Sequence, residues 1–159
     1  MSAASPFERN LIDEALHSDL APIEKGIALV LTPDTSEYRI IRDAAIWPAL
    51  SACGFVPTPD LAFDSGASLS YVAQWVRGAE LIVADVTGLN ADVMYALGLC
   101  HGLGRYPLLT SQDSDVLPFG LRSLRCISYW NDTGGLWVLR EDLARAVRVF
   151  VASAGKSAG

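Results

Sequence analysis

The sequence has little positive charge and no long apolar run. Its 12 Lys and Arg residues are outnumbered by 18 Asp and Glu residues, which gives a formal net charge of -6. Proteins that bind a nucleic-acid backbone neutralise phosphates with clustered Lys and Arg, so this composition argues against that class. No run approaches the roughly 20 apolar residues that cross a membrane. The first residues, MSAASPFERN, also lack the pattern of a secretory signal. We therefore expect no nucleic-acid partner, no membrane partner and a cytoplasmic location.

Metal ligands are scarce as well. His17 and His101 are the only histidines, and the three cysteines, Cys53, Cys100 and Cys126, are widely spaced within apolar stretches. No pair has the close spacing of zinc ligands, so we predict no metal site. Buried free thiols of a reducing compartment are the expected state of these cysteines. The chain also lacks the glycine-rich phosphate motifs, and no cofactor is expected.

The sequence does contain ample material for one folded domain, because 51% of its 159 residues are hydrophobic. Apolar runs of strand length alternate with helical patterns along the chain. The predicted strands are 27–31, 55–56, 80–86, 107–110 and 125–129, and the predicted helices are 5–20, 36–53, 69–76, 91–103 and 136–152. Such alternation predicts an α/β fold, a three-layer sandwich with a five-stranded parallel sheet of Rossmann or flavodoxin type and helices on both faces.

Breaks in the pattern divide the chain into three parts. Residues 1–26 are predicted to be an N-terminal helix and linker, 27–152 the α/β domain and 153–159 a disordered tail. Within the helix predicted for 36–53, we expect a bend at Trp47-Pro48, because proline disfavours a helical residue before it.

In parallel sheets, ligands bind beyond the carboxyl ends of the strands. Asp85 ends the clearest strand, Gly88 permits an unusual turn after it, and Asn90 can cap the next helix. The amides freed at this helix start are able to hold a phosphate or carboxylate. The alternative is a purely structural joint in which Asp85 is bound to neighbouring amides.

The segment IVADVTGLNADVMYALGLCHGLGRYPLLT resembles the core of the nucleoside 2-deoxyribosyltransferase-like superfamily. This superfamily also includes nucleotide N-glycosidases and TIR-like nucleotide-binding proteins. The resemblance extends in outline over residues 27–129 and includes Glu37-Tyr38, the segment 47–50, Asp60 and Pro118-Phe119. It implies a nucleoside or nucleotide ligand, cleavage of an N-glycosidic bond and a homodimer.

One departure from the family pattern bears on activity. In active relatives, the glutamate of Tyr-Glu-Leu-Gly attacks the anomeric carbon or stabilises the positive charge that develops on the sugar. The matching residue here is Ala96, so the resemblance implies little glycosidase activity. The chain is a natural pseudoenzyme, a variant whose nucleophile was removed, or an enzyme in which Asp92 substitutes. Asp92 also has a simpler role, because an acidic first turn stabilises a helix.

The resemblance and the strand ends together define a candidate site. Asp85 and the position of Ala96 form its catalytic part, and the candidate ligand-binding residues are Asp34, Asp60, Thr87, Gly88, Asn90, Asp92 and Tyr95. A second hypothesis is a TIR-like signalling or protein-interaction module without catalysis. An open polar pocket at Asp85 favours the first hypothesis, and a crevice filled by Tyr95 or tryptophan side chains favours the second.

Overall fold

The computed structural model describes residues 22–58 and 69–156. The helix predicted for 5–20 and the loop residue Asp60 lie outside these ranges. The described strands are β1 (Glu24–Leu31), β2 (Val56–Pro57), β3 (Ala79–Asp85), β4 (Leu108–Ser111) and β5 (Cys126–Ser128). They form one sheet in the order β2-β1-β3-β4-β5, and every pair is parallel. The predicted five-stranded parallel sheet is therefore confirmed.

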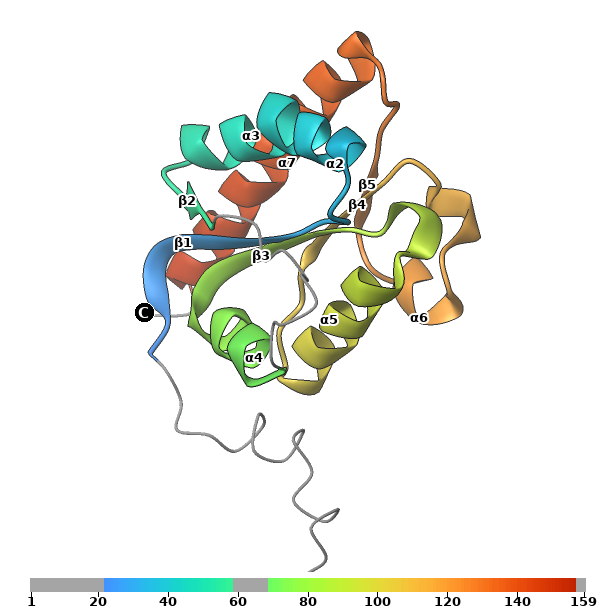
Figure 1. Cartoon of the computed structure of the whole chain (residues 1–159). Coiled ribbons are helices and arrows are strands. Elements are labelled where there is room, and N and C mark those ends of the chain that lie inside the picture. The colour runs from blue at the N-terminus through green and yellow to red at the C-terminus, as the bar shows by residue number, and fades with distance from the viewer. Residues whose placement is uncertain (1–21, 59–68, 157–159) are drawn as a thin grey trace, which may run out of the picture.

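Helices cover both faces of the sheet (Figure 1). The helical segments are α2 (Ser36–Ile41), η1 (Arg42–Ile46), α3 (Trp47–Ala52), α4 (Leu69–Gly78), η2 (Thr87–Leu89), α5 (Ala91–Gly102), η3 (Ser114–Val116), α6 (Phe119–Arg122) and α7 (Thr133–Lys156). Segments α2, α3 and α7 lie on one face, and α4 and α5 lie on the other (Figure 1). The architecture is the three-layer sandwich that the sequence predicts.

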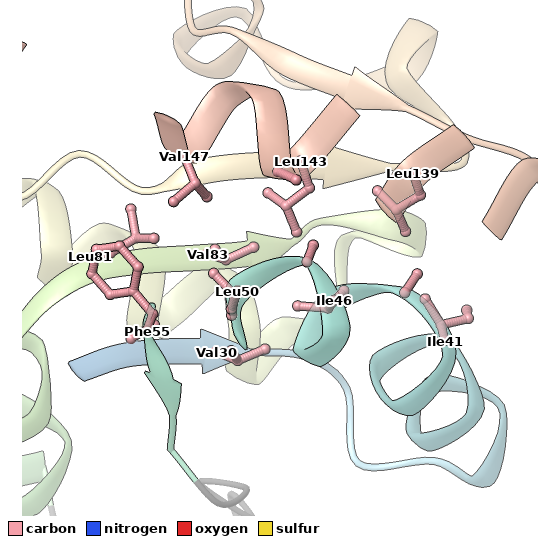
Figure 2. Close-up of a cluster of buried hydrophobic side chains, with 14 of the residues drawn as sticks. Val30, Ile41, Ile46, Leu50, Phe55, Leu81, Val83, Leu139, Leu143 and Val147 are labelled. Atoms are coloured by element: carbon pink, nitrogen blue, oxygen red, sulfur yellow. The ribbon is translucent and has the colours of Figure 1, made fainter. Parts of the chain in front are cut away.

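The central parts of β1 and β3 are apolar because both faces of the sheet are buried there. Along β3, Leu81 and Val83 point into the layer under α7, whereas Ile82 and Ala84 point into the layer under α5. Figure 2 shows the first layer, in which Leu139, Leu143 and Val147 line one side of α7. They face the side chains of the sheet and of the α2–α3 segment (Figure 2). Each face therefore has its own apolar core.

The segment predicted as one helix over 36–53 contains a π-helical turn, Arg42–Ile46, between α2 and α3. Pro48 has no amide hydrogen, and its ring clashes with the carbonyl four residues earlier in a regular α-helix. Before the proline, the amide of Trp47 donates to the carbonyl of Arg42, five residues back. The disturbance expected at Trp47-Pro48 is thus taken up one turn earlier, as a π-turn.

Predicted boundaries are wrong at both ends of the α/β domain. Strand β1 begins at Glu24, so residues 24–26 belong to the sheet and not to a linker. The carboxylate of Glu80 accepts the amide of Gly26 at 2.6 Å and fixes this first part of the strand. At the other end, α7 continues to Lys156, so residues 153–156 are helical and not a disordered tail. Among the described residues, no helix is both long and apolar enough to cross a membrane.

Candidate functional site

The candidate site lies where the order of the strands changes direction. Strand β1 pairs with β2 on one side and with β3 on the other, so chain connections leave in opposite directions from the pair β1–β3. In sheets of this order, ligands bind outside the carboxyl ends of these strands. Leu31 ends β1 and Asp85 ends β3, and Leu31 pairs in register with Ala84. The sequence correctly placed Asp85 at the end of a strand.

Asp85 is fully buried, with 0% of its surface exposed, and it is hydrogen-bonded at both carboxylate oxygens. Its Oδ1 accepts the amide of Thr87 at 3.0 Å. Its Oδ2 accepts the hydroxyls of Thr110 and Tyr129, each at 2.7 Å. Thr110 belongs to β4 and Tyr129 follows β5, so one side chain connects the ends of three neighbouring strands. These donors offset the cost of burying a carboxylate.

Protonation at the site is governed mainly by burial. Burial raises the pKa of Asp85, while hydrogen bonds from Thr87, Thr110 and Tyr129 act in the opposite direction. Burial, together with the nearby charge of Asp85, raises the pKa of the Tyr129 phenol. Burial likewise raises the pKa of Tyr38 to about 12, although a hydrogen bond with Thr87 lowers it. Both tyrosines therefore stay protonated at neutral pH, and Asp85 is a bound acceptor and not a free base.

The turn after β3 contains one residue, Leu89, with a strained backbone. Gly88 has φ of 63° and Leu89 has φ of 49°. A residue with a Cβ pays about 1–2 kcal/mol in this left-handed region, and such strain gathers at functional sites. The hydroxyl of Thr87 accepts the amide of Gln112 at 3.0 Å, which fixes this turn against the end of β4.

Asn90 caps α5 as the sequence predicted. Its Oδ1 accepts the amide of Asp92 at 3.1 Å and that of Val93 at 3.2 Å. Two other turns at this edge follow the same rule: the Thr35 hydroxyl accepts from the amide of Tyr38, and the Asp132 carboxylate accepts from the amide of Gly135. The amides of Asp92, Val93, Tyr38 and Gly135 are therefore already bound by side chains of the chain itself.

The structure does not gather all the predicted residues. Ala96 is 0% exposed and lies in the apolar layer between α5 and the sheet. Tyr95, on the same helix, is 60% exposed, so it does not fill the crevice. The side chain of Asp92 is exposed in the first turn of α5. Asp34 forms a surface ion pair with Arg39 at 2.7 Å.

Three residues of the polar network were not predicted from the sequence, Thr110, Gln112 and Tyr129, and Tyr38 was noted only for its place in the family resemblance. Thr110 and Tyr129 carried one usable signal, because each is a polar residue at the end of a predicted strand. Gln112 carried none, since its role depends on contacts with Thr87 and Tyr129 that only the folded chain makes.

Several carboxylates surround the network and make this edge electronegative. The charges of Asp85, Glu37 and Asp113 all raise the pKa of Tyr38. Within residues 22–58 and 69–156, no group of three His, Cys, Asp or Glu side chains is arranged to hold a metal ion. The site is therefore a buried hydrogen-bonded network in a region of negative potential.

Comparisons of the chain with family models, with curated proteins and with solved structures found no match. A functional conclusion must therefore come from the site itself and from the motif after β3.

Proposed function

We propose that this chain binds a nucleoside or nucleotide at the carboxyl ends of β1 and β3 and does not cleave the N-glycosidic bond. One observation carries the proposal: a buried, multiply hydrogen-bonded carboxylate, Asp85, stands at the point where the strand order changes direction. The strained backbone of Leu89 in the turn after β3 supports the same location. The identity of the ligand class comes from the resemblance of residues 82–110 to the deoxyribosyltransferase-like superfamily.

The absence of catalysis follows from the residues present. Cleavage of an N-glycosidic bond needs a carboxylate close to the anomeric carbon, because positive charge develops on the sugar. Ala96 offers only a buried methyl group at the family's nucleophile position. Both oxygens of Asp85 are already hydrogen-bonded. Asp92 lies on the exposed side of α5 and has no described polar partner that would position it for attack.

Among the two ligand forms, the uncharged nucleoside suits the site better than the phosphorylated one. A phosphate is held by free amides or by cations, and here Asn90 and Asp132 already bind three of the amides of their turns. Arg39, the cation nearest to Asp34, is bound to that carboxylate. The negative potential that raises the pKa of Tyr38 also opposes a phosphate dianion.

The test is a calorimetric titration of the chain with a panel of nucleosides and their 5′-monophosphates, with chromatography of the same mixtures to detect released base. We expect a nucleoside to bind, its monophosphate to bind more weakly, and no base to be released. The variant Asp85→Asn removes the charge that positions Thr87 and Tyr129 and should weaken binding, whereas Glu141→Gln, an exposed change on α7, should not. Release of base would refute the non-catalytic part of the proposal. Binding by neither ligand form would refute the proposal as a whole.

A second candidate function, a TIR-like interaction module, is favoured by two exposed tryptophans. Trp130 is 77% exposed just before α7, and Trp137 is 64% exposed in its first turns. Large exposed aromatic side chains are typical of protein interfaces. We expect a homodimer in sedimentation experiments, and Trp130→Ser with Trp137→Ser should shift it toward the monomer. A chain that is monomeric at all concentrations would argue against this function.

A further inference from the structure

A separate feature of the molecule is the free edge of the sheet at β5. The sheet ends at this strand, and within the described residues no strand pairs with its outer side. The amide of Tyr129 donates to the carbonyl of Ser111 in β4 at 3.1 Å. Because successive residues of a strand direct their backbone groups to opposite edges, the backbone groups of Cys126 and Ser128 face away from β4. The edge therefore presents hydrogen-bonding groups to an additional strand.

A hollow of about 230 Å³ runs along this edge, between β5 and the side of α7. It is lined by the three residues of β5 and by Arg125, Asp142 and Arg145. Arg145 pairs with Asp142 at 2.9 Å, and Arg125 forms no ion pair with any described residue. The hollow thus holds two guanidinium groups and one carboxylate, in a chain whose net charge is -6.

We propose that the free edge of β5 binds an extended acidic peptide segment of a partner protein, which pairs with the strand through its backbone. Addition of a strand to an exposed sheet edge is an established mode of peptide recognition. The side chains of an added strand alternate between its two faces, so acidic residues at alternate positions all face α7 and Arg145. Arg125 meets the end of the segment that lies beside the start of β5.

The local charge supports an acidic peptide as the occupant of this edge, and the length of β5 limits how tightly the peptide binds. Interactions between exposed charges are screened beyond about 8 Å at physiological ionic strength, so the local arginines outweigh the distant carboxylates of the chain. Arginine binds carboxylates in a two-pronged geometry that lysine lacks. The edge strand has only three residues, Cys126–Ser128, which limits the peptide to a few backbone hydrogen bonds and predicts weak, reversible binding.

The experiment is fluorescence anisotropy with a labelled eight-residue peptide (about 26 Å when extended) of alternating Val and Glu. A peptide of alternating Val and Lys serves as the charge control. The double variant Arg125→Ser/Arg145→Ser should weaken binding of the Glu peptide about fivefold to tenfold, since each exposed pair contributes modestly. The matched variant Arg140→Ser/Arg148→Ser removes the same charge from exposed positions of α7 outside the hollow and should bind as the unmodified chain does.

Backbone pairing is tested separately at Ser128. Proline there removes the outward amide and leaves the bonds to β4 in place, because proline is tolerated on an edge strand. Ser128→Pro should therefore weaken peptide binding, and Ser128→Ala, which like proline loses the hydroxyl contact with Ser114 at 2.7 Å, should not. The proposal fails if the Glu peptide does not bind, if the Lys peptide binds equally well, or if both arginine double variants behave alike. In those cases the arginines serve only to protect the edge from aggregation.

Discussion

The hydroxyl of Tyr129 is predicted to stabilise the fold through its bond to Asp85. Tyr129→Phe removes one of the donors to a carboxylate that is 0% exposed, and the phenyl ring keeps its place in the core. A hydrogen bond to a charged group contributes about 1.5–3 kcal/mol, and the bonded oxygen left behind has no access to water. We therefore expect the free energy of unfolding to fall by about 1.5–3 kcal/mol at neutral pH, or roughly 3–12 °C in Tm for a chain of this length.

Urea unfolding followed by tryptophan fluorescence measures this change. Tyr106→Phe is the matched control, because Tyr106 is largely exposed and its hydroxyl has no described partner; it should stay within about 0.5 kcal/mol of the unmodified chain. In a double-mutant cycle, the cost of Tyr129→Phe should shrink when Asp85 is already Asn, since the acceptor has lost its charge. If Tyr129→Phe unfolds at the same urea concentration as the unmodified chain, the account of the buried network is wrong.

Three further predictions follow from the same structure. Burial raises the pKa of Asp85 above its value of 3.8 in the unfolded chain, so the folded state holds this proton more tightly and loses stability as the pH rises from that value through the raised pKa. In urea unfolding, the stability of Asp85→Asn relative to the unmodified chain should therefore increase as the pH rises above 3.8. Ala96→Glu should lower the free energy of unfolding by about 2 kcal/mol or more beyond the loss caused by Ala96→Met, because both side chains overfill a fully buried site and only Glu brings a charge. Equal losses for the two variants would contradict the burial of Ala96. Burial raises the pKa of Cys100 to about 12 and that of Cys126 to about 11. Neither thiol should therefore react with an aromatic disulfide reagent near pH 8 until the chain unfolds, and the absorbance of the released thiolate measures the number of thiols that react.

The strands were predictable because their composition reflects a local fact, burial on both faces. The apolar run 27–31 and the strand ending at Asp85 needed no knowledge of the rest of the chain. The π-turn at Arg42–Ile46 was not predictable in form. Pro48 indicates that the regular helix is interrupted, but the sequence does not indicate which hydrogen-bonding pattern the preceding turn adopts. The helical state of residues 153–156 was missed since small and polar residues give no apolar stripe there.

The site was predictable in position but not in construction. Asp85, Gly88 and Asn90 lie within six residues of one another, so the turn and the helix cap that they form can be predicted from the local sequence. The partners of the Asp85 carboxylate are far away in the chain: Thr110 is 25 residues later and Tyr129 is 44 residues later. Their convergence depends on the register of β3, β4 and β5, which no local pattern encodes.

The order of synthesis affects folding, because one of the two apolar cores is completed only when the last helix, α7, has been made. The layer that holds Val30, Ile46 and Leu50 is built early in the sequence, yet it is covered by Leu139, Leu143 and Val147 of α7. Until these residues leave the ribosomal tunnel, the apolar side chains on this face of the sheet stay exposed and can bind other nascent chains or chaperones. A nonsense mutation anywhere before α7 would therefore yield an aggregation-prone fragment and not a smaller working domain.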